Sequence, residues 1–298
     1  MASQPHGLCD AHVHFFSPSF FAGLGAGRDA ITALGWEYPE SVEALAARWV
    51  AELDRHAVAR AALIASLPGD ADAVAKAAAL HASRFVGFFM LDPTREDALS
   101  YAERALDEGL RAICLFPAMH RYALHDERVA RVFALAAGRR GHTVEPIAVF
   151  VHCGVLSVGI RKKLNLPSPF EMRFGNPLDL QGVAQAHPSV PVIIPHFGAG
   201  LLREALMLAD ACPQVYLDTS SSNAWIKYTP GLTLEQVFQA ALDVAGPERL
   251  LFGTDSSFFP RGWNREVYDR QRVALNNLGV SPDAQAHIFG ANFSRLFR

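Results

Sequence analysis

Cysteine is scarce in this chain, and its cysteines form no sequence pair. Cys9, Cys114, Cys153 and Cys212 are far apart, and no two of them make a C-x-x-C motif. Three of the four lie in or beside apolar runs that are typical of strands, where a reduced thiol packs as a small hydrophobe. We therefore expect packing residues rather than disulfides, as in proteins of a reducing compartment.

Long apolar runs, a basic leader and blocks of like charge are missing as well. No stretch approaches the roughly 20 apolar residues that span a bilayer, and the opening MASQPHGLCD lacks the basic and apolar segments of a secretory signal. The 27 basic and 30 acidic side chains give a formal net charge of −3, which offers no electrostatic reason to bind nucleic acid or a membrane. The sequence predicts a cytoplasmic protein whose partner is a small-molecule substrate.

Two common motifs of catalysis are also absent. No G-x-G-x-x-G turn follows an early strand-like run, which argues against an open doubly wound sheet. No G-x-S-x-G elbow is present, so a serine nucleophile of that kind is not expected.

What the chain does have is a regular alternation of two patterns. Eight short apolar runs read as strands buried on both faces of a parallel sheet. They cover residues 8–14, 60–67, 85–91, 110–116, 147–153, 190–196, 214–220 and 249–255. The segments between them have apolar residues at helical spacing, and several end in Gly or Pro. These segments are residues 41–56, 71–83, 95–109, 126–141, 176–188, 201–213 and 233–247.

This alternation predicts an α/β fold, a (β/α)8 TIM barrel, which typically takes ~250 residues. We expect residues 1–298 to form a single domain of this kind. The surplus length falls mostly in two long loops, residues 15–40 after the first strand and residues 154–175 after the fifth.

The unusual polar residues fall at the carboxyl ends of the predicted strands. His12 and His14 are two positions apart, so their side chains should share a face of the first strand. His152 lies near the end of the fifth predicted strand, and His196 and Asp255 end the sixth and eighth. In a barrel these ends meet at one mouth, where active sites are built. Imidazole and carboxylate donors gathered there suit a divalent transition metal, with Zn²⁺ as the first choice.

Other side chains near the same mouth are candidates for binding substrate. They are Arg161, Arg173, Arg28, His120 and Trp225. An arginine facing the mouth would grip a carboxylate with two hydrogen bonds, although each of these arginines is equally a candidate for a solvated surface cation. The neighbouring Lys162 and Lys163 are expected to stay in solvent.

Residues of the late loops add weaker candidates. Phe258, Phe259 and Trp263, together with Trp225, would wall a pocket for a flat acid or else pack against neighbouring loops. Candidate hydrogen-bond partners of the substrate follow the seventh predicted strand, and they are Ser220, Ser221, Ser222 and Asn223.

The ordered set of motifs resembles the amidohydrolase superfamily. More narrowly, it resembles the branch that contains aminocarboxymuconate-semialdehyde decarboxylase, resorcylate decarboxylases and pyrone-dicarboxylate lactonase. The matching segments run from residue 10 to residue 297. They are DAHVHFF, FVHCG, GNPLDLQGVAQAHPSVPVIIPHFGAG, VYLDTSSS, LLFGTDSSF and IFGANFSRLF.

The resemblance implies roles for individual residues. It implies that His12, His14, His152 and Asp255 hold one metal ion, and that His196 helps to activate water or is a further ligand. Relatives with two metals often carry a carboxylated lysine on the fourth strand, and LRAICLF has no lysine, which favours one ion. The resemblance also makes a homodimer an expectation.

Three functions are compatible with this reading. The first is a metal-dependent hydrolase of a small carboxylated or cyclic substrate, in which Asp255 and His196 are catalytic and a metal-bound water of lowered pKa attacks the substrate. The second is a non-oxidative decarboxylase of an aromatic or unsaturated acid, and the third is a non-catalytic metal-binding barrel. The metal ligands alone do not distinguish the first two, and the sequence does not identify the substrate.

Overall fold

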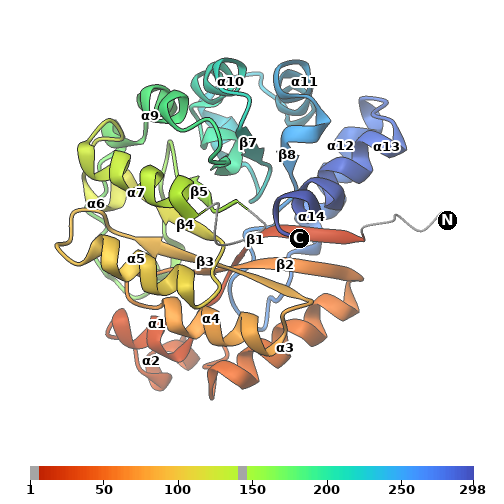
Figure 1. Ribbon diagram of the computed structural model, residues 1–298. Coiled ribbons are helices and arrows are strands. Elements are labelled where there is room, and N and C mark those ends of the chain that lie inside the picture. Colours follow the sequence, from red (N-terminus) through yellow and green to blue (C-terminus); the bar gives the residue numbers. More distant parts are fainter. Residues whose placement is uncertain (1–6, 140–145) are drawn as a thin grey trace.

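Eight parallel strands form one sheet in the order in which they occur in the chain (Figure 1). The structure is a computed structural model that describes residues 7–139 and 146–298. The strands are β1 (Leu8–His14), β2 (Val58–Ala65), β3 (Phe85–Leu91), β4 (Ala112–Leu115), β5 (Ala148–Val151), β6 (Val192–Ile194), β7 (Val215–Asp218) and β8 (Leu250–Leu251). The predicted (β/α)8 barrel is confirmed.

Backbone hydrogen bonds close the sheet between its first strand and the segment that follows β8. The Ala11 amide donates to the Phe252 carbonyl at 2.8 Å, and the His14 amide donates to the Ser256 carbonyl at 2.7 Å. In the reverse direction, the Asp255 amide donates to the His12 carbonyl at 2.9 Å. These bonds join β1 to the segment that follows β8, so His12 and His14 lie next to Asp255.

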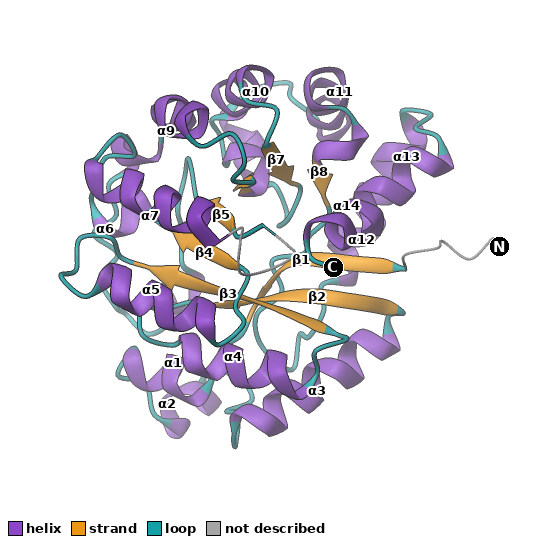
Figure 2. Ribbon diagram, in the orientation of Figure 1, coloured by secondary structure: helices purple, strands orange, loops and turns teal. Residues whose placement is uncertain are grey.

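Helices surround the sheet on its outer side (Figure 2). Those that follow the strand-like runs of the prediction are α3 (Val42–Arg55), α4 (Ala71–Leu80), α5 (Ala98–Asp107), α7 (Glu127–Gly138), α10 (Leu202–Ala211), α11 (Leu234–Ala245) and α12 (Arg265–Asn277), each of ten residues or more, and the six-residue α9 (Gln181–Ala186). The shorter helices and turns are α1 (Pro18–Gly23), α2 (Arg28–Ala33), α6 (Pro117–His120), α8 (Gly159–Lys163), α13 (Pro282–Ala286), α14 (Asn292–Leu296), η2 (Met172–Gly175), η3 (Pro177–Leu180), η4 (Pro195–Gly198), η5 (Ala224–Tyr228), η6 (Pro247–Arg249) and η7 (His287–Ala291).

Helix α11 shows why these segments are helical. The Thr233 side chain accepts from the Gln236 amide while the Gln236 side chain accepts from the Thr233 amide, so the helix begins with a capping box. Its buried residues, which include Val237, Phe238 and Ala241, recur at helical spacing and face the barrel.

Apolar side chains fill the barrel and close its amino end. The interior cluster includes Phe88, Met90 and Phe150, and the C-terminal segment adds Phe293 and Phe297 to the same cluster. The rings of Phe88 and Phe297 lie 5.1 Å apart. Because the amino end is plugged by apolar residues, the carboxyl end is left for polar chemistry.

The two long loops contain short helices that the sequence reading did not predict. Residues 15–40 contain α1 and α2, and residues 154–175 contain α8 and η2. Ser17 caps α1 and Pro18 opens it, which is local chemistry too short to give a periodic pattern. Apolar side chains of both loops pack into one cluster that covers the carboxyl end of the barrel.

The boundaries of several elements differ from the prediction. Strands β6 and β8 stop short, so His196 and Asp255 lie beyond the last strand residue rather than in a strand. The helix predicted over residues 126–141 ends at Gly138, and its residues from 140 on lie outside the described part of the chain. Within residues 7–139 and 146–298, no helix combines the length and apolar character needed to cross a membrane. That residues 1–298 make a single domain stays a prediction.

Candidate active site

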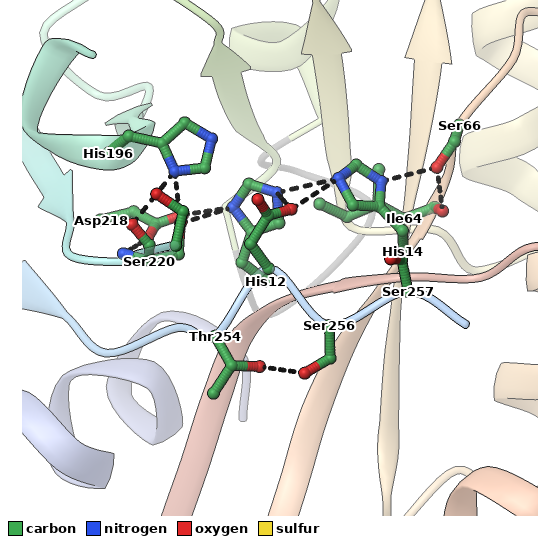
Figure 3. A network of polar contacts seen from close by, with 12 residues as sticks. His12, His14, Ile64, Ser66, His196, Asp218, Ser220, Thr254, Ser256 and Ser257 are labelled. Atoms are coloured by element: carbon green, nitrogen blue, oxygen red, sulfur yellow. Dashed lines mark hydrogen bonds and ion pairs between the residues drawn. The ribbon is translucent and has the colours of Figure 1, made fainter. Parts of the chain in front are cut away.

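Strand β1 delivers two imidazoles to the carboxyl end of the barrel. Its pairing with β2 shifts register between Asp10 and Val13, and the His12 amide donates to Asp10 Oδ1 at 2.9 Å. The side chains of His12 and His14 share a face, as their spacing predicts, and their Nε2 atoms lie 3.3 Å apart (Figure 3).

Asp255 completes a triangle with the two imidazoles. Its Oδ1 lies 3.1 Å from His14 Nε2 and 3.7 Å from His12 Nε2. Asp255 holds a left-handed backbone with φ 58°, which is uncommon for a residue other than glycine. The bond from its amide to the His12 carbonyl helps to hold it there, and strained backbone of this kind is frequent at functional sites.

A buried carboxylate anchors the turn that carries Asp255. Asp10 accepts hydrogen bonds from the His12 amide, from the amide and hydroxyl of Thr254 at 3.1 and 2.5 Å, and from Trp263 Nε1 at 2.7 Å. Burial raises the pKa of Asp10 to about 6, against the lowering effect of the bonds from Thr254, His12 and Trp263. Trp263, a candidate for the pocket wall, is therefore a structural partner of Asp10.

Hydrogen bonds on the far side of each ring determine where the imidazole protons lie. His12 Nδ1 is 2.7 Å from Asp218 Oδ2, so it is the protonated nitrogen of that ring. His14 Nδ1 is 2.7 Å from Ser66 Oγ, and this hydroxyl donates its own proton to the Ile64 carbonyl at 3.1 Å. Ser66 therefore accepts from His14 Nδ1, a contact drawn in Figure 3. Since both rings hold their proton on Nδ1, both Nε2 atoms carry lone pairs.

The triangle has the dimensions of a metal site. With metal–ligand bonds of about 2.05 Å, neighbouring ligands of a tetrahedral zinc lie roughly 3.3 Å apart, and the three separations here are 3.1, 3.3 and 3.7 Å. Two imidazole lone pairs and a carboxylate facing one point repel each other unless a cation lies between them. His12, His14 and Asp255 thus fit a divalent ion and could hold it.

His196 and His152 lie beside this triangle. The His196 ring stacks on the His12 ring with centroids 5.0 Å apart, and the His152 ring lies 5.3 Å from the His196 ring. His152 Nδ1 is buried and has no hydrogen-bond partner among the described residues, so it is a polar atom in need of a ligand. His152 falls outside the group whose donor atoms lie within 4.8 Å of one another.

The electrostatics of the site favour neutral His152 and His196 imidazoles beside an ionised Asp255. Burial lowers the pKa of His196 and lowers that of His152 well below its usual value. Burial alone would raise the pKa of Asp255, but its close contact with His14 and the positive field at His12 hold it far below its usual range. For His12, burial acts to lower the pKa and the Asp218 and Asp255 carboxylates outweigh it, so the field favours a cation here.

A cavity of about 450 Å³ opens over these residues. One wall is aromatic: the Trp36 and Phe258 rings stack 3.8 Å apart, and the Phe16 and Phe20 rings stack 4.1 Å apart. These residues come from the segments after β1 and β8, so the long first loop forms part of the pocket.

The charges that line the cavity are unbalanced. Asp255 is its acidic residue, whereas Arg161, Lys163 and Arg261 are cationic. Arg261 donates to the Asp255 carbonyl at 3.2 Å and to Ser257 Oγ at 3.0 Å. In the part of the chain that the structure describes, none of the three cations has a carboxylate oxygen within 4.0 Å. An anion therefore finds unpaired positive charge in this cavity.

Of the three arginines predicted to bind substrate, one lines the cavity and two do not. Arg161 lines the cavity, where its guanidinium donates to the Pro167 carbonyl. Arg28 is exposed and pairs with Glu40 at 2.9 Å, and Arg173 is exposed and pairs with Glu171 at 2.7 Å. Neither lines the cavity. Each is paired with an acidic neighbour at the surface, and a role for these two in binding substrate stays a prediction.

The other two candidates for substrate binding also lie off the cavity lining. Trp225 is buried and donates from Nε1 to Asn223 Oδ1 at 3.0 Å. His120 sits at the end of α6 with its Nδ1 buried and without a hydrogen-bond partner among the described residues. Lys163, expected in solvent, lines the cavity while it stays exposed.

Sequence reasoning missed three residues of the site. Asp218 ends β7 and Ser66 follows β2, so the strand-end rule that selected the histidines would have selected both. Arg261 had a weaker signal, since it lies six residues after Asp255 in a loop whose course is not periodic. Ser220, a candidate for the substrate, instead contacts His12 and His196.

A model of the amidohydrolase family, the amidohydrolase-2 branch, matches residues 9–298. This chain belongs to the amidohydrolase family. Membership supports a metal-dependent enzyme of hydrolase type, and the His/His/Asp triangle is its candidate metal site.

Solved structures share the amidohydrolase barrel over its full length. A probable 2-pyrone-4,6-dicarboxylic acid hydrolase from Acinetobacter baumannii, with citric acid bound, is 15% identical with a TM-score of 0.62, covering 97% of this chain and 98% of that chain. An amidohydrolase from Burkholderia multivorans with bound zinc is 18% identical with a TM-score of 0.63, at the same coverage. At these identities the likeness shows the fold.

One curated relative matches over a short region. Protein fluG from Emericella nidulans is 31% identical over 97 residues, which are 32% of this chain. The match spans 11% of that protein's length, so it adds nothing about the activity of this amidohydrolase.

Proposed function

We propose that this chain is a metal-dependent hydrolase that activates water for attack on a small carboxylated or cyclic substrate. One divalent ion, Zn²⁺ in the first instance, is held by His12, His14, His152 and Asp255. The observation that carries the proposal is the convergence of two imidazole lone pairs and one carboxylate, 3.1 to 3.7 Å apart, at the floor of a cavity. His152 is proposed as the fourth ligand on the resemblance to the amidohydrolases, and its ring lies beside the triangle, 5.3 Å from the His196 ring.

The chain's own residues divide the chemistry between them. A divalent ion in such a site lowers the pKa of a coordinated water towards about 7. Asp255 is ionised and accepts the proton of the attacking water. His196 is neutral, and because its Nδ1 contacts the Ser220 carbonyl at 3.2 Å, its Nε2 lone pair is free to orient that water.

The charge of the cavity supports an anionic substrate. Arg261 uses Nη2 for its two protein contacts, which leaves further N–H groups to grip a carboxylate. The stacked Trp36 and Phe258 rings beside it suit a flat or unsaturated ring. That one structural neighbour contains bound citric acid agrees with this assignment.

The test combines metal analysis with a substrate screen. Purified protein is assayed for zinc, manganese and iron, and is then offered lactones and aromatic carboxylic acids while ring-opened product and CO₂ are measured separately. We expect about one metal ion per chain, and we expect ring-opened product. Formation of this product should be lost in Asp255→Asn and kept in the surface control Asp243→Asn. CO₂ as the product would establish the decarboxylase instead, and full activity without metal would refute the mechanism.

Zinc as the native metal, a homodimer and a cytoplasmic location stay predictions. Each has a direct measurement: the metal content, the mass in solution and fractionation of the producing cell.

A further inference from the structure

We infer that Asp218 and Ser220 are positioning residues that hold the protons of His12 and His196 on Nδ1, so that both Nε2 lone pairs face the cavity. The inference rests on the proposed function, because it assigns these two residues the role of orienting His12 and His196 at the metal centre. Neither residue lines the cavity, so each acts through an imidazole.

Asp218 uses both carboxylate oxygens as acceptors. Its Oδ2 accepts from His12 Nδ1 at 2.7 Å, and its Oδ1 accepts from the Ser220 amide at 2.6 Å (Figure 3). The side chain is fully buried at the end of β7. A carboxylate hydrogen-bonded to the distal nitrogen of a metal-binding histidine fixes the tautomer and ring orientation and raises the basicity of the ligand nitrogen.

Ser220 links the ligand histidine to the catalytic histidine. Its Oγ lies 2.9 Å from His12 Nδ1 and 2.9 Å from His196 Nδ1. A hydroxyl oxygen has two lone pairs and can accept from both rings, so His12 shares its one Nδ1 proton between Asp218 Oδ2 and Ser220 Oγ, and His196 shares its own between the Ser220 carbonyl and Oγ. The Ser220 carbonyl lies 3.2 Å from His196 Nδ1, and because a carbonyl only accepts, this nitrogen is the protonated one.

The backbone leaves room for this cluster at Gly253. A Cβ atom added there would lie 2.9 Å from both His12 Cβ and Ser220 Cβ, and 3.1 Å from Asp218 Oδ1. Such contacts are closer than a side chain tolerates without shifts, so the segment after β8 that leads to Asp255 passes against the cluster because residue 253 is glycine. The three residues are thus packed into one rigid unit.

The experiment measures zinc affinity rather than turnover. Asp218→Asn has a single side-chain acceptor oxygen, so it cannot satisfy both the His12 Nδ1–H and the Ser220 amide. Zinc affinity of the metal-free protein is measured by competition with a chromophoric chelator, and folding is followed by circular dichroism and by melting in EDTA. We expect zinc affinity to fall about 10- to 100-fold, with Asp243→Asn as the carboxylate-to-amide control at an exposed site.

A second variant keeps the inference testable if Asp218→Asn does not fold. Ser220→Ala leaves the Asp218 contact in place, so we expect a smaller loss of zinc affinity, about threefold to tenfold, the equivalent of one neutral hydrogen bond. A role confined to stability would lower the melting temperature and leave the zinc affinity of the folded protein unchanged, and that result would overturn the inference while the hydrolase proposal stands. Failure of the unmodified chain to bind zinc would overturn both.

Discussion

Asp70 gives a prediction whose size follows from the structure. It lies in the turn before α4 with 4% of its surface exposed, and it ties down the start of the loop that forms the aromatic wall of the cavity. Ser17 Oγ donates to its two oxygens at 2.9 and 3.0 Å, and Ser19 Oγ also donates to it. Burial raises the pKa of Asp70 to about 6 from 3.8, with Asp72 acting in the same direction and both serines against it.

The sign and the size follow from this shift. A carboxyl whose pKa is higher in the folded state stabilises the protein fully below pH 3.8, and that stabilisation is lost as pH rises through about 6. The shift is about 2 units, and each unit corresponds to about 1.4 kcal/mol. The ionised Asp70 therefore costs the folded state roughly 2 to 3 kcal/mol at pH 7 compared with pH 4.

The assay compares Asp70→Asn with the unmodified chain by urea unfolding at intervals from pH 4 to pH 7. Asparagine does not ionise, and all other titrating groups are common to both proteins. We expect the free energy of unfolding of Asp70→Asn to rise relative to the unmodified chain by about 2 to 3 kcal/mol over this range. A difference that is independent of pH, or one that falls as pH rises, would refute the reasoning, and Asp243→Asn serves as the exposed control.

Three further outcomes follow from the site. Arg261→Gln should lower kcat/KM for a carboxylated substrate about 10- to 100-fold, because a charge-assisted hydrogen bond is lost. The kcat/KM for a neutral analogue should not change. Steady-state kinetics measure both values, with Arg173→Gln as the control. Gly253→Ala should lower the free energy of unfolding by about 1 to 3 kcal/mol through overpacking against His12 and Ser220; denaturant unfolding measures it, and an unchanged stability would contradict the close packing. Asp255→Asn should lower kcat by about 10²- to 10⁴-fold, and a variant that retains full turnover would remove Asp255 from the chemistry.

The sequence predicted those parts of the site that depend on strand geometry. His12 and His14 share a face because they lie two positions apart in a strand, and Asp255 meets them because parallel strand ends gather at one mouth. The strand-end rule works at long range because the barrel itself closes the distance between residues 12 and 255.

The parts that depend on irregular backbone were not predictable. Arg161 reaches the cavity and Arg173 does not because α8 and η2 take different courses within one loop. The stack of Trp36 on Phe258 joins two loops that have no periodic pattern. Asp255 and His196 have left-handed backbone conformations. Neither is glycine, the residue type from which such a conformation is usually predicted.

The most direct test of the central claim is anomalous diffraction from crystals of the zinc-loaded protein. The account predicts one strong zinc peak within about 2.0–2.2 Å of His12 Nε2, His14 Nε2 and an Asp255 oxygen. A peak elsewhere on the chain, or no peak at the end of β1 in protein saturated with zinc, would contradict it.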